Sequence, residues 1–146
     1  GSYYVRDFDC ALGNWLNMGS SMCIHAETCG RALAIEHDGY VYSCDHYVYP
    51  EYRLGRIGES PLSELVDTPK QKAFGEDKKA SLCAKCRDCR YRFACGGDCP
   101  KHRFVQQPGE SNKLSYLCPS YMHFFSHIRP TIEKMAADWR RNQGNR

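Results

Sequence analysis

No apolar run in the 146-residue sequence approaches the length of about eighteen residues that a membrane-spanning helix requires. No segment has the features of a secretory signal peptide, and there is no internal repeat or low-complexity stretch. These absences exclude a membrane-spanning protein and a repeat architecture. They favour a single globular domain in the cytoplasm, with no membrane partner.

The sequence also lacks a strong charge of either sign, because 20 Lys and Arg against 17 Asp and Glu leave a formal net charge of +3. Basic side chains nevertheless gather in one stretch that contains few acidic ones. A nucleic-acid-binding patch is one interpretation of that stretch. We favour the other, that cations offset the charge of cysteine thiolates, and expect no nucleic-acid partner. The residues are Lys85, Arg87, Arg90, Arg92, Lys101 and Arg103, against Asp88 and Asp98.

Local patterns predict an α+β fold, as a small Cys-rich metal-cluster domain over residues 3–146. Gly1-Ser2, with no initiator Met, is typical of the scar that tag cleavage leaves. Apolar spacing predicts a helix over about 7–18, and Asp38-Gly39 between alternating segments predicts a β-hairpin. Ser60 as N-cap with Pro61 at the first helical position predicts a short helix, and a second is expected over 68–74.

A long helix is predicted from Ser120 onward, with a kink or a break into two helices at Pro130. We expect its apolar stripe to form core or a docking face for another domain. The stripe comprises Tyr121, Phe125, Ile128, Ile132, Met135 and Trp139.

Cysteine is abundant, with 10 in the chain, and five of them lie within "CAKCRDCRYRFACGGDC", residues 83–99. Disulfides, zinc and iron–sulfur clusters all use cysteine at this density. The C-x2-C spacing is that of ligand pairs, which argues against a disulfide framework. Zinc remains an alternative, because two zinc ions would use eight thiolates and His102 is a further candidate ligand. Iron–sulfur clusters take the same four thiolates each, so spacing alone does not decide between them.

The complete order of cysteines is more specific than any one pair. It reads Cys23-x5-Cys29-x9-Gly39-x4-Cys44, then Cys86-x2-Cys89-x5-Cys95-x3-Cys99, then Cys118. From Cys29 onward this order resembles the SPASM domain, the C-terminal extension of certain radical S-adenosylmethionine enzymes. The additional Cys23 and the run "DGYVYSCDHYVYPEYRLGRIG" resemble the anaerobic sulfatase-maturating enzymes in particular. The resemblance extends over about residues 5–139.

The resemblance implies two auxiliary [4Fe-4S] clusters with four cysteine ligands each. The first would be held by Cys23, Cys29, Cys44 and Cys99, and the second by Cys86, Cys89, Cys95 and Cys118. Such interleaved ligands would join the hairpin, the Cys-rich stretch and the C-terminal helix, so the metal-free domain is expected to fold poorly. Two cysteines are left over. Cys10 is interpreted as a small buried hydrophobe, and Cys83 is an alternative to Cys86 as a ligand.

The family oxidises a Cys or Ser of a sulfatase to Cα-formylglycine, and the carboxylate that follows the third hairpin-cluster cysteine is the implied base. Asp45 occupies that position, and its alternative interpretation is a solvated loop carboxylate. The C-x3-C-x2-C motif that binds S-adenosylmethionine is absent. We therefore expect this chain to be the C-terminal part of a larger enzyme, inactive alone. Its implied partners are an N-terminal radical barrel and a sulfatase peptide.

Overall fold

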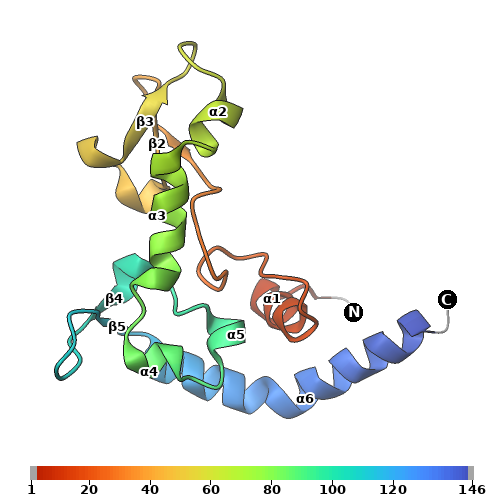
Figure 1. Ribbon diagram of the computed structural model, residues 1–146. Helices are drawn as coiled ribbons and strands as arrows, with labels where there is room; N and C mark the ends of the chain where they lie inside the picture. The colour runs from red at the N-terminus through yellow and green to blue at the C-terminus, as the bar shows by residue number, and fades with distance from the viewer. Residues whose placement is uncertain (1–2, 145–146) are drawn as a thin grey trace. The chain divides into compact units, whose positions relative to one another are not determined.

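The computed structural model describes residues 3–144 and divides the chain into two compact units (Figure 1). One unit contains Thr28–Ser81. The other contains the described residues up to Glu27 together with those from Leu82 onward. Short strands and helices in both units confirm the predicted α+β class. The presumed scar Gly1-Ser2 lies outside the described residues, and within residues 3–144 no helix is long and apolar enough to cross a membrane.

The unit Thr28–Ser81 is built on an antiparallel sheet with strand order β1-β2-β3. The predicted hairpin is confirmed, since Ile35 of β1 pairs with Val41 of β2 across the turn at Gly39. Gly39 has a φ of +82°, a conformation that glycine adopts without steric cost. The strands are β1 (Ala34–Ile35), β2 (Tyr40–Tyr42) and β3 (Arg53–Arg56), with the 3-10 turns η1 (Asp45–Tyr47) and η2 (Pro50–Tyr52) between β2 and β3.

Two helices complete this unit, α2 (Leu62–Val66) and α3 (Pro69–Ala80). The prediction of Ser60 as the cap of α2 was wrong, because Pro61 is the extended N-cap residue and no side chain caps that end. The cap of α3 is Thr68, which accepts the N–H of Gln71 at 3.2 Å. The Gln71 amide donates to the carbonyls of Gly30 (2.8 Å) and Ser43 (3.0 Å). These bonds fix α3 beside the segments that carry Cys29 and Cys44.

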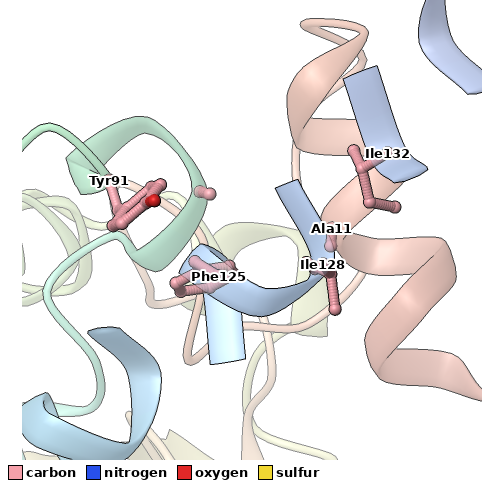
Figure 2. Packing of buried hydrophobic residues seen from close by; sticks show 6 residues of the cluster. Ala11, Tyr91, Phe125, Ile128 and Ile132 are labelled. Carbon is pink, nitrogen blue, oxygen red and sulfur yellow. The ribbon is translucent and has the colours of Figure 1, made fainter. Parts of the chain in front are cut away.

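The second unit is mainly helical, and its core lies between α1, α5 and α6. Figure 2 shows Tyr91, Phe125, Ile128, Ile132 and Ala11, which pack together with Ala94 in this core. Its elements are α1 (Arg6–Trp15), α4 (Ala84–Arg87), α5 (Arg92–Cys95), η3 (Pro100–His102), β4 (Arg103–Val105), β5 (Leu114–Ser115) and α6 (Cys118–Gly144). The predicted N-terminal helix is therefore present and ends at Trp15, just before Asn17 with its φ of +58°.

The long C-terminal helix is also present, as the single helix α6. Pro130 lies inside it and does not divide it in two, although Figure 1 shows the helix changing direction along its course. The predicted apolar stripe is core in its middle, where Phe125, Ile128 and Ile132 are buried. Its last two residues are partly exposed, Met135 at 46% and Trp139 at 40%.

Candidate metal centre

Four of the predicted ligands line one cavity of about 570 Å³. Cys86 comes from α4, Cys89 from the segment after it, Cys95 from the end of α5, and Cys118 from the first position of α6. The four side chains, which span 33 positions of sequence, therefore face the same space. Apolar side chains cover much of the remaining wall, with basic ones at its edge. They include Leu114, Pro119, Met122 and Phe125, and Lys85, Arg90 and Arg92.

The short helix α4 positions Cys86 and Cys89. Cys83 is the N-cap residue of α4, and its carbonyl accepts the N–H groups of Cys86 and Arg87 at 3.0 Å each. Cys89 follows the end of α4, and its Sγ accepts the N–H of Tyr91 at 3.4 Å. An N–H bond to a sulfur is the kind of contact that stabilises a thiolate ligand.

A left-handed turn separates Cys95 from Cys99. Gly96, Gly97 and Asp98 have φ values of +61°, +76° and +62° in succession. The two glycines are also required by space. A Cβ on Gly96 would lie 2.6 Å from the carbonyl oxygen of Ala26, and a Cβ on Gly97 would collide with Leu82. These three residues form a tight turn between the two cysteines.

Three of the cavity thiols, those of Cys86, Cys95 and Cys118, have a raised pKa in the metal-free protein. Burial, followed by the neighbouring Cys83, raises the pKa of Cys86 from about 9 to about 12. Burial raises the pKa of Cys95 to about 11, and it also raises the pKa of Cys118. All four cavity cysteines are reduced thiols. A cationic group that replaced these protons would remove the cost of burying thiolates, so the donor set fits an iron–sulfur cluster.

The remaining predicted ligands are divided between the two units. Cys23 and Cys99 belong to the helical unit, and Cys29 and Cys44 to the unit Thr28–Ser81. Within its unit, Cys29 donates its N–H to the carbonyl of Gly75 at 3.2 Å, and a side chain on Gly75 would collide with that backbone. Among residues 3–144, no three His, Cys, Asp or Glu side chains are grouped closely enough to hold one metal ion.

Asp45 lies directly after Cys44, at the start of η1, and its carboxylate is exposed. The Cys44 thiol donates to its Oδ1 at 3.1 Å and the N–H of His46 donates to the same oxygen at 3.0 Å. The hydrogen bond from Cys44 is the main cause that lowers the pKa of Asp45 below its ordinary value. Asp45 is thus an ionised, accessible carboxylate, which is what a proton acceptor requires.

The two leftover cysteines are both buried. Cys10 is 2% exposed, and its Sγ lies 3.0 Å from the Ser20 hydroxyl. Cys83 is 0% exposed and is not among the residues that line the cavity, whereas Cys86 is.

One set of polar residues beside the cavity was not identified as a site from the sequence. Asp98 is fully buried and accepts hydrogen bonds from Ser115, Tyr121 and His102. His102, a candidate zinc ligand in the sequence, has its Nδ1 3.0 Å from Asp98 Oδ2. The sequence feature that could have indicated this site is the position of Asp98 between the pair Gly96-Gly97 and Cys99.

The metal-free protein is expected to lose stability as the pH rises from about 9 through about 11 and 12, the raised pKa values of Cys95 and Cys86. The folded state binds these thiol protons more tightly than the unfolded chain does. The stabilisation is therefore complete below pH 9 and is lost on deprotonation. Denaturant midpoints across this range measure the loss. A Cys86→Ser/Cys95→Ser variant, which retains every Lys and Tyr, should show a shallower decline. An identical decline in both proteins would contradict this prediction.

Comparisons with known proteins agree with this arrangement. The SPASM family, described as an iron–sulfur cluster-binding domain, matches residues 23–90. The serine-type anaerobic sulfatase-maturating enzyme of Bacteroides thetaiotaomicron is 40% identical over 135 residues, which are 92% of this chain and 33% of that protein. The cysteine-type enzyme of Clostridium perfringens is 33% identical over 132 residues, 90% of this chain and 35% of that protein.

Solved structures lead to the same family. Native anSMEcpe with bound AdoMet and Kp18Cys peptide aligns with a TM-score of 0.75 and 32% identity, over 91% of this chain and 36% of that one. The chain spans about a third of the length of the curated relatives it matches. Residues 23–90 belong to the SPASM family of iron–sulfur cluster-binding domains, and the chain as a whole is similar to part of the anaerobic sulfatase-maturating enzymes.

Proposed function

We propose that this chain is the auxiliary-cluster domain of a radical S-adenosylmethionine enzyme that oxidises a sulfatase Cys or Ser to Cα-formylglycine. The observation that carries the proposal is the cavity whose wall contains Cys86, Cys89, Cys95 and Cys118 together. Those are the residues that the SPASM pattern assigns to one cluster. Relatives of the serine type and of the cysteine type support the substrate class, and one similar structure contains a bound peptide.

The cavity residues hold the proposed [4Fe-4S] cluster through four thiolates. When bound, such a cluster supplies one-electron transfer. The apolar wall, including Met122 and Phe125, keeps water from the thiolates, and Lys85 offsets their negative charge. For Cys118 that effect is visible directly, since the positive charge of Lys85 opposes the rise in its pKa.

A second cluster is proposed at Cys23, Cys29, Cys44 and Cys99, on the strength of the family pattern. Two of these cysteines belong to each compact unit, and a single domain over residues 3–146 is part of the same proposal. Zinc in the same thiolate sites is the alternative occupant, since it accepts the same ligands.

Asp45 is proposed as the base of the reaction. A substrate Cys or Ser that has lost a Cβ hydrogen atom must still lose one proton and one electron to become an aldehyde or thioaldehyde. The exposed Asp45 carboxylate accepts that proton. Its hydrogen bond from Cys44 requires the thiol proton, which metal ligation removes. Ligation of Cys44 would therefore release an acceptor site on Asp45 next to the metal.

The proposed partners follow from the same reaction. An N-terminal barrel generates the 5′-deoxyadenosyl radical, and a sulfatase peptide supplies the oxidised residue. We also propose a cytoplasmic location, because a reducing compartment preserves thiols for cluster assembly.

The ligand assignment predicts different outcomes for two neighbouring cysteines. Cys95→Ser should remove about half of the bound iron and sulfide, because one of two [4Fe-4S] clusters loses a ligand. Cys83→Ser, a buried position outside the cavity wall, should retain the full content. Iron and acid-labile sulfide per chain measure both. Retention in Cys86→Ser with loss in Cys83→Ser would instead assign the ligand role to Cys83.

The role of Asp45 is tested in an enzyme that joins this chain to its radical barrel. Asp45→Asn should lower formylglycine formation by roughly 10²–10⁴-fold, the range that a positioned base contributes. Iron and sulfide content should stay unchanged, because the amide retains the size of the carboxylate. Asp38→Asn, a change of the same kind at the exposed hairpin turn, is the matched control. Full activity in Asp45→Asn would remove this residue from the mechanism.

A further inference from the structure

The only fully buried carboxylate among the described residues belongs to Asp98, which is 0% exposed. It occupies the last position of the left-handed turn between Cys95 and Cys99, with a φ of +62°. A residue with a Cβ is less stable in that conformation than glycine is. A buried carboxylate on a strained backbone is costly twice over, so its surroundings must offset both costs.

Those surroundings are a set of hydrogen-bond donors. Oδ1 accepts from the N–H of Cys99 at 2.7 Å, from His102 Nδ1 at 3.1 Å and from the Tyr121 hydroxyl at 3.4 Å. Oδ2 accepts from the Ser115 hydroxyl at 2.6 Å and from His102 Nδ1 at 3.0 Å. Four groups thus converge on the two carboxylate oxygens, an arrangement that compensates a buried negative charge.

The turn that carries the anion is itself fixed in place. Arg103, 9% exposed, donates from Nε to the carbonyl of Gly97 at 2.9 Å and from Nη2 to the carbonyl of Asp98 at 3.1 Å. The Ser115 hydroxyl also accepts the N–H of Leu117 at 3.0 Å, which sets its direction toward Asp98. The carboxylate therefore has little freedom to move away from its donors.

Two of the donors belong to the wall of the cysteine cavity. Ser115 and Tyr121 line that cavity and point their hydroxyls at Asp98, so the negative charge lies one hydrogen bond behind the wall. The turn that carries Asp98 follows Cys95 directly, and Gly97 of that turn is itself part of the cavity wall.

We propose that Asp98 is a positioning residue that lowers the reduction potential of the cluster held by Cys86, Cys89, Cys95 and Cys118. The inference rests on the proposed occupation of that cavity. An electron added to a cluster is repelled by a fixed negative charge nearby, and low dielectric around the cavity strengthens the repulsion. Asp98 thereby favours the oxidised state of the cluster, while Ser115 and Tyr121 hold the charge at a fixed distance.

The test is the midpoint potential of the cluster-loaded protein in Asp98→Asn, followed by electron paramagnetic resonance during a redox titration. The amide keeps the size of the side chain and removes the charge. We expect a shift to more positive potential that corresponds to at least a tenfold change in the reduction equilibrium, about 59 mV for one electron. Repeating the titration in a Cys44→Ala background, which lacks a proposed ligand of the other cluster, assigns the signal to the cavity.

Two further variants keep the charge and remove one donor each, Ser115→Ala and Tyr121→Phe. They leave the carboxylate less compensated, so the potential should fall, opposite in sign to Asp98→Asn. If Asp98→Asn does not assemble its cluster, the midpoint potentials of Ser115→Ala and Tyr121→Phe test the inference instead. A more positive potential in both variants would overturn it. An unchanged potential in Asp98→Asn with normal iron and sulfide would overturn it alone. A wild-type protein without iron and sulfide would overturn the proposed function with it.

Discussion

Four thiols line one largely apolar cavity, and the helical unit must offset the cost of bringing them together. Buried among one another, Cys86 and Cys95 hold their protons far above neutral pH, with pKa values of about 12 and 11. Thiols of this kind bind metal only when a cationic group replaces the protons and removes the cost of burying their charge. Metal binding and folding of the unit therefore share one source of free energy, because the cluster would join the short stretch that contains Cys86, Cys89 and Cys95 to Cys118 at the start of α6.

The left-handed turn Gly96–Gly97–Asp98 connects that chemistry to the fold. It ends α5 at Cys95, brings the backbone against Ala26 and Leu82, and leaves Asp98 in the interior. The same three residues thus determine where α5 ends, where Cys99 lies, and where the buried carboxylate lies. Arg103 and Ser115, both C-terminal to the turn, hold it by hydrogen bonds to the Gly97 carbonyl and to the Asp98 carboxylate, and these bonds explain why a strained position persists.

Much of the fold was predictable because it depends on local rules. The hairpin follows from Asp38-Gly39 between alternating residues, and α6 from an apolar stripe of helical period. Ser60 was the wrong cap because capping depends on where the backbone first becomes helical, one residue later than Pro61 suggested. Local sequence also did not determine whether α6 would continue through Pro130 or divide there. Packing of Ile128 and Ile132 holds the helix together on both sides of the proline, and proline's local preference does not include packing.

The candidate site was predictable in part. The family cysteine pattern predicted Cys86, Cys89, Cys95 and Cys118 as one ligand set, and all four line the same cavity. Asp98 was not identified, since its burial results from Ser115 and Tyr121, which only tertiary structure brings to it. A carboxylate surrounded by basic residues in sequence has an ordinary interpretation as a counter-charge. Its number of donors and its 0% exposure are properties of the folded unit alone.

The most direct test of the cluster assignment is the content of iron, acid-labile sulfide and zinc per chain in protein purified without oxygen. Two [4Fe-4S] clusters predict about eight irons and eight sulfides, and a cluster in the cavity alone predicts about four of each. Sulfide separates the alternatives, because zinc–thiolate sites contain none. About two zinc ions without sulfide would contradict the iron–sulfur assignment and leave a structural zinc module in its place.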